Sequence, residues 1–149
     1  KLGYILNKQR QHKATIQARL GRIEGLQFRR HTDEAGDSAT FFHLLMPNEE
    51  QARACVKLLG EAGIGVGYWY DNMFHYIKQW DHVKNLSAPY KMVAHELGLP
   101  QDLKTIKFPK SDAVMSRLIS FNIRVTWTDA ELNAMLDKME GAVKQALLT

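Results

Sequence analysis

The stretch Gly63-Ile64-Gly65-Val66-Gly67-Tyr68-Trp69-Tyr70 decides how the rest of this chain can be arranged. Larger side chains alternate with glycines in it, a period of two that predicts a strand over residues 65–70. Glycine weakens a strand unless another part of the backbone must come close, so we expect a close neighbour here. The residues that follow can hydrogen-bond, stack or titrate: Asp71, Asn72, His75, Tyr76, Trp80, Asp81 and His82. We therefore expect part of a functional site at the end of this strand.

The composition is ordinary for a globular domain, with 149 residues, of which 45% are hydrophobic and 24% charged. No apolar run approaches the roughly 20 residues that a membrane-spanning helix needs, and residues 1–22 are too polar for a signal peptide. The single cysteine, Cys55, excludes an internal disulfide framework and is typical of a reducing compartment. We therefore predict one domain, in the cytoplasm and without a membrane partner. Because the chain opens at Lys1 in a helical pattern, we expect it to be a piece of a longer protein.

The net charge of +4 and the isoelectric point of about 9.2 raise the question of a nucleic-acid partner. Much of the excess lies in residues 1–30, where eight basic side chains face one acid, Glu24. Charge runs of this kind are usually solvated helix faces. No RNA-binding strand motif is present, and adjacent residues such as Trp69 and Tyr70 would project to opposite faces of a strand. We therefore favour a solvated helix face over a nucleic-acid partner.

Hydrophobic periodicity and capping signals divide the chain into helices and strands. Spacing of three and four residues predicts a long helix that fades between Gly21 and Gly25, and a last helix over residues 129–147. Capping boxes precede two helices: Asn48 with Gln51, and Thr128 with Glu131. Strands are expected over 26–28, 39–46 and 119–125, an inner helix over 49–62, and short helices over 89–97 and 112–117, the last capped by Ser111. This order predicts an α/β or α+β fold with helices stacked on one face of a small sheet.

The usual signatures of several catalytic classes are missing. Aspartate and histidine gather after residue 70, but there is no His-Glu-x-x-His motif and no pair of cysteines, so no metal site is predicted. Cys55 falls on the apolar face of its helix, where a buried structural thiol is expected rather than a nucleophile. The glycines between 60 and 67 enter a strand and are not followed by Gly-Lys-Ser/Thr, so they do not predict a phosphate loop.

Several motifs nevertheless occur together in a familiar order. They are Lys1-Leu2-Gly3-Tyr4-Ile5-Leu6 with Arg10 and Lys13, Gly36-Asp37-Ser38-Ala39-Thr40-Phe41, Asn48 to Ala62 with Gly63-Ile64-Gly65-Val66-Gly67, Ser111-Asp112 through Ile123, and Trp127-Thr128-Asp129-Ala130-Glu131. In this order they resemble the C-terminal part of the DegT/DnrJ/EryC1/StrS family of sugar aminotransferases, which are fold-type-I pyridoxal-phosphate enzymes. Trp69-Tyr70-Asp71-Asn72 stands where that family commonly has His-Tyr-x-Pro. The form Trp-Tyr-x-Asn-x-x-His resembles the branch that aminates octulosonate-type sugars.

The resemblance implies that residues 1–149 are the small domain of a longer aminotransferase, with residues 1–24 as the helix that links two domains. It implies a small, mostly antiparallel sheet with helices packed on one face. The family transfers an amino group from glutamate to a keto-sugar, here a nucleotide sugar or a sugar acid, with pyridoxal 5'-phosphate as electron sink. The implied partners are the large N-terminal domain of the same protein and a second subunit of a homodimer, and a role in sugar or lipopolysaccharide biosynthesis is expected.

No catalytic residue is expected within the chain itself, because the family's Schiff-base lysine belongs to the large domain. Lys78, Lys84 and Lys91 lie in small-domain positions, so none of them is assigned that role. We expect the chain to supply a wall of the active site and part of the subunit interface. A free-standing, non-catalytic binding or regulatory module with a basic ligand-binding face is the alternative.

The predicted substrate-binding residues are Trp69, Tyr70, Asn72, His75, Arg117 and Arg124. An aromatic surface beside hydrogen-bonding side chains suits a sugar ring, which has an apolar face and a rim of hydroxyl groups. Arginine offers a planar, two-pronged donor that suits a carboxylate of glutamate or of a sugar acid. The alternatives stay open: the aromatic residues pack in the core while His75 caps a helix, and the arginines form surface ion pairs with Asp112, Asp129 or Glu131.

Overall fold

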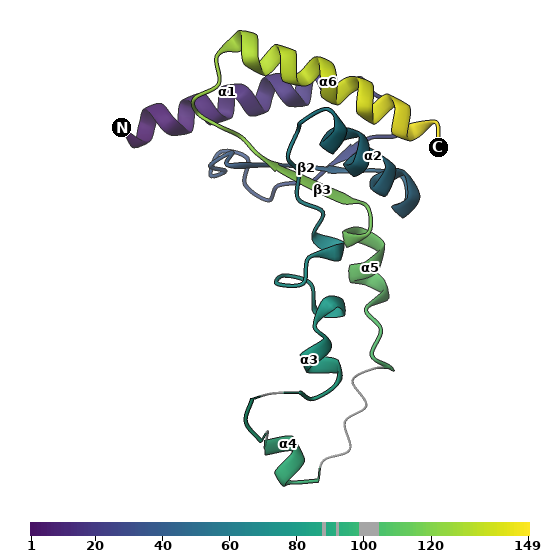
Figure 1. Cartoon of the computed structure of the whole chain (residues 1–149). Coiled ribbons are helices and arrows are strands. Elements are labelled where there is room, and N and C mark those ends of the chain that lie inside the picture. The colour runs from purple at the N-terminus through teal and green to yellow at the C-terminus, as the bar shows by residue number, and fades with distance from the viewer. Residues whose placement is uncertain (88, 92, 99–104) are drawn as a thin grey trace.

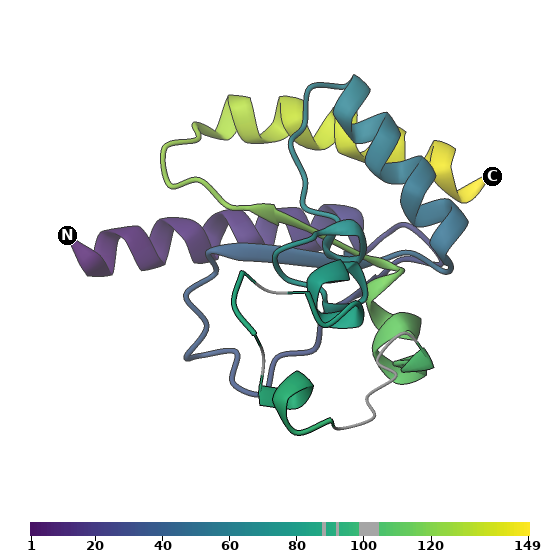
Figure 2. The ribbon, with the colours of Figure 1, turned by 60° about the horizontal axis from the view of Figure 1, so that its bottom comes forward.

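A computed structural model describes residues 1–87, 89–91, 93–98 and 105–149. The chain forms two regions that differ in shape (Figure 1). Residues 1–68 and 117–149, which we call the body, form a sheet covered by long helices. The described part of residues 69–116, which we call the arm, leaves the body at one point and extends away from it. Figure 2 views the same arm nearly end-on, with the body behind it.

The sheet in the body has three antiparallel strands in the order β1-β2-β3. They are β1 (Gln27–Phe28), β2 (Phe41–Leu45) and β3 (Leu118–Asn122). Phe42 lies opposite Phe121, and Leu44 lies opposite Ile119. Because successive side chains point to opposite faces of a strand, these four apolar residues share one face of the sheet. All four are buried, so this is the face on which the core forms.

Three helices cover that face: α1 (Leu2–Leu20), α2 (Glu49–Glu61) and α6 (Asp129–Leu147). Both ribbon views show α1 and α6 lying side by side and running in the same direction (Figures 1 and 2). Each helix contributes side chains with no exposed surface to one continuous core, including Leu20, Leu59 and Leu136. The predicted fold is therefore confirmed: an α+β arrangement with a long N-terminal helix, a small antiparallel sheet and helices packed on one face.

The capping box predicted at Thr128 is confirmed in full, whereas at Asn48 only the N-cap hydrogen bond is formed. The side-chain oxygen of Asn48 accepts a hydrogen bond from the Gln51 amide at the start of α2. At the start of α6, the Thr128 hydroxyl accepts from the Glu131 amide, and the Glu131 carboxylate accepts from the Thr128 amide. Each bond satisfies an amide that the helix itself cannot pair.

The arm consists of short elements joined by turns. They are η1 (Trp69–Asp71), η2 (Ile77–Gln79), α3 (Asp81–Lys84), α4 (Val93–Glu96) and α5 (Pro109–Met115). Of the helix predicted over 89–97, only α4 is present, and Ala88, Met92 and residues 99–104 lie outside the described residues. The predicted cap at Ser111 is wrong, because α5 begins at Pro109, whose fixed φ and missing N–H suit the first helical position.

The strand predicted over residues 65–70 is also wrong. Only Gly67 pairs, in a single antiparallel bridge with Ser120 of β3, and Trp69 already belongs to η1. The close neighbour expected at the glycines is present at Gly67, where an added Cβ would lie 2.8 Å from the Ser120 hydroxyl oxygen. At Gly65 nothing lies within 4 Å of an added Cβ. The segment therefore touches β3 at one residue and then turns into the arm.

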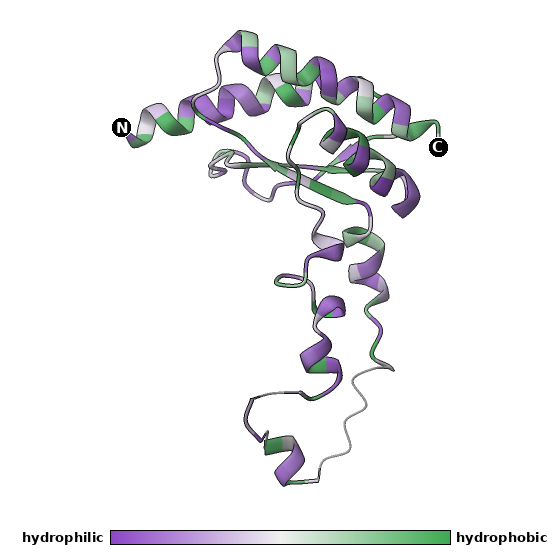
Figure 3. Ribbon diagram, viewed as in Figure 1, coloured by the Kyte–Doolittle hydropathy of each residue, from purple (hydrophilic) through white to green (hydrophobic). Residues whose placement is uncertain are grey.

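Figure 3 shows apolar residues concentrated in β3, whereas the helices of the body and the elements of the arm both carry interleaved polar and apolar residues. None of the helices formed by the described residues has the length and apolar character needed to cross a membrane.

Candidate functional site

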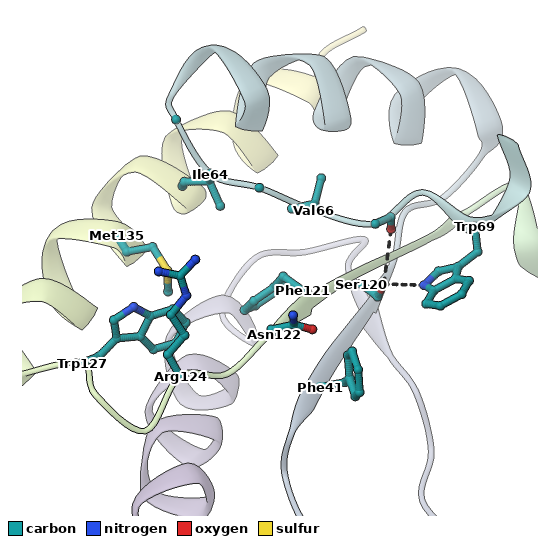
Figure 4. A pocket seen from close by; sticks show the side chains of 13 residues that line it. Phe41, Ile64, Val66, Trp69, Ser120, Phe121, Asn122, Arg124, Trp127 and Met135 are labelled. Atoms are coloured by element: carbon teal, nitrogen blue, oxygen red, sulfur yellow. Dashed lines mark hydrogen bonds between the residues drawn. The ribbon is translucent and has the colours of Figure 1, made fainter. Parts of the chain in front are cut away.

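A cavity of about 620 Å³ opens between the 63–67 segment, the outer edge of β3 and the start of α6. Its volume is within the range of small-molecule sites. Figure 4 shows that its walls come from segments far apart in the sequence. The lining residues are Phe41, Gly63, Ile64, Gly65, Val66, Gly67, Trp69, Ser120, Phe121, Asn122, Arg124, Trp127 and Met135. We call this cavity the β3 pocket.

The β3 pocket exists because two backbone segments meet and then separate. The Gly67 amide donates to the Ser120 carbonyl at 2.6 Å, and the Ser120 amide donates to the Gly67 carbonyl at 2.9 Å. An antiparallel pair would continue to Gly65 and Asn122, but no such bridge forms among the described residues. The Ile123 amide donates toward β2, to Thr40, so the alternation of the strand directs the Asn122 amide and carbonyl toward the pocket. The pocket therefore offers backbone hydrogen-bonding groups as well as side chains.

Trp69 forms one wall of the β3 pocket and is fixed by hydrogen bonds. Its indole N–H donates to the Ser120 hydroxyl, and that hydroxyl donates to the Gly67 carbonyl at 3.3 Å. Ser120 is 3% exposed, so this bonding chain is shielded from water. The indole plane is thereby set by the same bridge that begins the pocket (Figure 4).

His75 and Asn72 lie next to Trp69. The rings of His75 and Trp69 are nearly perpendicular, at 85°, with centroids 4.6 Å apart. The Asn72 side-chain oxygen accepts hydrogen bonds from the Phe74 and His75 amides at 2.9 and 3.0 Å. The same oxygen lies 2.9 Å from His75 Nδ1. Three of the predicted substrate-binding residues, Trp69, Asn72 and His75, therefore form one connected group, of which Trp69 alone is among the residues lining the β3 pocket.

Arg124 lies at the opposite end of the β3 pocket, beside Trp127 and Met135 (Figure 4). Its carbonyl accepts a hydrogen bond from His12 Nδ1 at 3.0 Å, and His12 is only 2% exposed. That bond holds the backbone of Arg124 in place. The Arg124 side chain lines the pocket. Within the described residues Arg124 forms no ion pair, and the expected partner Glu131 is bonded to Thr128 instead. Arg124 is exposed, and a cation with no acidic partner among the described residues can bind an anionic group.

Arg117 and Tyr70 are not brought to the β3 pocket. Arg117 donates to the Met46 carbonyl at 2.6 Å and to Gln27 at 3.3 Å, so it joins the ends of the three strands. Tyr70 is 7% exposed and packs at the base of the arm, where Lys78 bonds to its hydroxyl and lies 4.5 Å from its ring centroid. Of the six predicted residues, only Trp69 and Arg124 line the β3 pocket, and Asn72 and His75 lie beside Trp69.

Of the residues lining the β3 pocket, only Trp69 and Arg124 are predicted from the sequence; the others include the polar Ser120 and Asn122 and the aromatic Trp127. Ser120 and Asn122 were visible as polar residues at alternate positions of the predicted strand. Trp127 was interpreted only as part of a helix start. The sequence does not show that residues 63–66 diverge from β3. The space left between the two segments is the cavity that these side chains line.

The base of the arm carries a second polar group, which holds the arm to the body. Arg53 of α2 binds both oxygens of Asp71, at 2.6 and 3.0 Å, and also Glu49 at 2.9 Å. These hydrogen bonds raise the pKa of Arg53. The Tyr68 hydroxyl donates to the Ser116 carbonyl at 2.7 Å, and burial raises the pKa of Tyr68 to about 12. Each of these side chains is hydrogen-bonded to another residue of the chain, so we assign the group a structural role.

Cys55 and the basic residues of α1 also have structural surroundings. Cys55 has no exposed surface, and burial raises the pKa of its thiol to about 12, which confirms the predicted structural thiol. Lys13 bonds to Asp37 at 2.6 Å, Arg10 to the Ala35 and Asp37 carbonyls, and Arg19 to Glu140 at 3.0 Å. Much of the positive charge predicted at the N-terminus is therefore used within the chain. Among the described residues, no group of three or more histidine, cysteine, aspartate or glutamate side chains could hold a metal ion.

The same fold occurs in solved aminotransferase structures. 3-Amino-5-hydroxybenzoic acid synthase matches 97% of this chain over 35% of its own length, with 21% identity and a TM-score of 0.64. The sugar aminotransferase CalS13 from Micromonospora echinospora matches 92% of this chain over 30% of its length, with 15% identity and a TM-score of 0.57. Spr1654 from Streptococcus pneumoniae, a candidate sugar aminotransferase in its PLP form, matches 96% over 32%, with 14% identity and a TM-score of 0.63.

These matches show a shared fold. The chain spans about a third of the length of the structures that it matches, and that third is C-terminal. No protein-family model matches the sequence. The matches cover 97%, 92% and 96% of this chain, so the similarity of fold extends over nearly all of it.

Proposed function

We propose that residues 1–149 are the C-terminal small domain of a pyridoxal-phosphate-dependent sugar aminotransferase, with residues 1–24 as the helix that links it to a large domain. The observation that carries the proposal is the fold, which matches solved aminotransferases over nearly the whole chain and over a third of theirs. The motif order in the sequence supports the same assignment independently. The homodimer, the cytoplasmic location and the role in sugar biosynthesis are part of this proposal and rest on the resemblance alone.

The residues of this chain do not fit covalent attachment of the cofactor. The described lining of the β3 pocket contains no lysine. Lys78 is bonded to Tyr70, and Lys84 is bonded to Asp81 at 2.9 Å. We therefore assign the Schiff-base lysine to the large domain, and none of the residues described here is assigned a catalytic step. When bound, pyridoxal phosphate supplies the electron sink for amino transfer.

The β3 pocket is the part of this chain that we assign to the sugar substrate. Trp69 and Trp127 offer aromatic surface for the apolar face of a sugar ring, and Asn122 offers donor and acceptor groups for its hydroxyls. Arg124 can bind a carboxylate or phosphate with two parallel hydrogen bonds. The proposed reaction is amino transfer from glutamate to a keto-sugar. The matched structures lend no support to the octulosonate branch in particular, so the proposal leaves the sugar unspecified.

The decisive experiment uses the intact gene product that contains this sequence. It should show a visible absorbance band on adding pyridoxal phosphate, and borohydride should abolish the band by fixing the cofactor to a lysine. That lysine should map outside residues 1–149. Amino transfer from glutamate to a panel of keto-sugars should follow. A gene product without a cofactor-binding domain would overturn the proposal and favour the free-standing binding module.

Arg124 and Arg117 provide a matched pair for testing the pocket. Arg124→Lys in the intact enzyme should raise KM for the anionic substrate about tenfold, because lysine cannot reproduce the two-pronged geometry. Arg117→Lys should leave KM unchanged and lower only thermal stability, since Arg117 bonds to Met46 and Gln27. If the KM values of the Arg124→Lys variant equal those of the parent enzyme in both half-reactions, Arg124 does not bind the substrate.

A further inference from the structure

We propose that Gln9 and His12 of α1 are positioning residues for Arg124, and that they determine where the β3 pocket binds the anionic group of its ligand. We call these two side chains the α1 clamp. The proposal rests on the proposed function for the identity of the ligand, whereas the contacts of the clamp lie within the chain. Neither residue lines the β3 pocket, so each acts on the ligand through Arg124.

The α1 clamp binds two successive carbonyl groups just after β3. The Gln9 side-chain amide donates to the Ile123 carbonyl at 3.1 Å. Nδ1 of His12 lies 3.0 Å from the Arg124 carbonyl, and a carbonyl oxygen can only accept, so Nδ1 carries a proton and donates. This holds for a neutral and for a protonated imidazole. Gln9 and His12 stand three positions apart, so they lie on one face of α1.

The segment that these bonds hold has little other support, because it forms no helix or strand between β3 and α6. Backbone hydrogen bonds fix its two ends, at the Ile123 amide toward β2 and at the Thr128 cap. Within the part of the chain that the structure describes, the backbone of residues 124–127 forms one hydrogen bond, the bond that His12 donates. The main-chain position of Arg124 therefore depends on α1.

The surroundings of His12 indicate that packing is not its only role. The side chain is 2% exposed, and its ring lies beside that of Trp127, with centroids 6.0 Å apart. Nε2 is buried and has no hydrogen-bond partner among the described residues. A buried nitrogen without a partner is unfavourable, so an apolar side chain would suit the packing better. The bond to the Arg124 carbonyl is the contribution that an apolar side chain cannot make.

The α1 clamp holds the end of the β3 pocket that Arg124 and Trp127 form (Figure 4). The Arg124 side chain is exposed and has no acidic partner among the described residues, so the position of its backbone decides where the guanidinium can reach. A third residue of α1, Lys8, lies 3.9 Å from Asp129 at the start of α6. Because α1 is also the helix proposed to link the two domains, the clamp would connect the cation of the pocket to that link.

Trypsin can test the clamp without any assumption about function. It cleaves after arginine, so the bond from Arg124 to Val125 reports on the carbonyl that His12 binds. In the intact protein, His12→Leu removes the donor, and cleavage after Arg124 should quicken about tenfold because the segment is released. Gln11→Leu, at an exposed glutamine of α1, should leave the rate unchanged. Cleavage after Lys138, inside α6, monitors global unfolding and should stay constant.

Kinetics on the intact enzyme separate positioning from packing. His12→Leu should raise KM for the anionic keto-sugar about fivefold and leave the glutamate half-reaction unchanged, and Gln9→Leu should act in the same direction. His12→Asn offers an amide nitrogen near the place of Nδ1 but loses the ring, so it should keep the parental KM at a lower thermal midpoint. Added to Arg124→Lys, His12→Leu should raise KM no further, because both act through one side chain.

Equal cleavage after Arg124 in the parent and in His12→Leu would overturn the proposal. A parental KM in His12→Leu, or KM values that follow thermal stability across the variants, would overturn it as well and leave His12 a packing residue. An intact protein without transaminase activity would refute the proposed function instead, and the cleavage rates would then decide whether the α1 clamp holds Arg124.

Discussion

The body and the arm belong to the same chain but are stabilised by different interactions: buried apolar packing in the body, and a few polar side-chain contacts in the arm. In the body, helices of 13 to 19 residues pack apolar side chains with no exposed surface onto one face of the sheet. In the arm, the longest element has seven residues, and large apolar side chains such as Phe74, Tyr90 and Leu97 remain 65–86% exposed. Burial of apolar surface is the main stabilising contribution to folding. The comparison therefore places the stability of the chain in the body.

The arm is oriented instead by a few side-chain contacts at its base. Arg53 of the body binds Asp71, and the Tyr76 hydroxyl donates to Asp112 across 36 residues of sequence. Segments with few buried contacts open locally, at a lower free energy than global unfolding. We therefore expect the arm to open while the body stays folded, and four predictions test that difference.

The largest effect is expected in the core of the body. Leu136 of α6 has no exposed surface, so Leu136→Ala should lower the free energy of unfolding by about 2–5 kcal/mol. Chemical denaturation followed by circular dichroism would measure it. Leu148→Ala is the control, since Leu148 is 88% exposed. Similar losses for the two variants would mean that the core does not carry the stability of the chain.

The next effect should be confined to the arm. Tyr76→Phe removes a hydrogen bond to the Asp112 carboxylate from a side chain that is 5% exposed, and should lower the free energy of opening the arm by about 2 kcal/mol. Hydrogen exchange should quicken in η2 and α5 and stay unchanged in α6. An equal increase of exchange in α6 would show that the arm and the body unfold together.

A smaller loss is expected at the cap of α6. Thr128→Ala removes the hydroxyl that accepts from the Glu131 amide, and should destabilise the body by about 1 kcal/mol. Thr126→Ala removes the same group from a neighbouring exposed position and should change stability little. The two thermal midpoints, compared at the same pH, measure the cap. Tyr76→Phe should affect only the opening of the arm, whereas Thr128→Ala should lower the free energy of unfolding of the whole body.

The smallest effect concerns pH and His43 of β2, whose side chain points to the face of the sheet opposite Phe42 and Leu44. Burial lowers the pKa of His43 below its usual 6.5, with further lowering by Arg29 and His31 and an opposing contribution from Asp37. Between the folded and unfolded pKa values the unfolded chain therefore binds more protons, so stability falls as pH falls below about 6.5. His43→Gln should make the dependence of stability on pH flatter between about pH 5 and 7. Parallel curves for the two proteins would contradict the assignment to His43.

The sequence predicted the body well because its signals are local. Periodicity and caps such as Asn48 fix where a helix begins, and alternation in β2 and β3 fixes which face is buried. The arm was predicted poorly because its contacts are long-range and polar: Arg53 reaches Asp71 and Tyr76 reaches Asp112. In the site, the sequence identified Trp69, Asn72 and His75 as neighbours, but a strand of alternating residues could not show that the chain turns at Trp69.

Gly65 and Gly67 stand two residues apart and look interchangeable in the sequence, yet their tolerance to change should differ sharply. A methyl group at Gly65 would meet open space, whereas at Gly67 it would displace the Ser120 hydroxyl from its bonds to the indole and to the backbone. A substitution at Gly67 would then break the hydrogen bond that orients the Trp69 indole. All the aromatic and charged residues that line the pocket would remain unchanged in the sequence. A single inherited change at this glycine would therefore alter the shape of the β3 pocket, and an inventory of its lining side chains would record no difference.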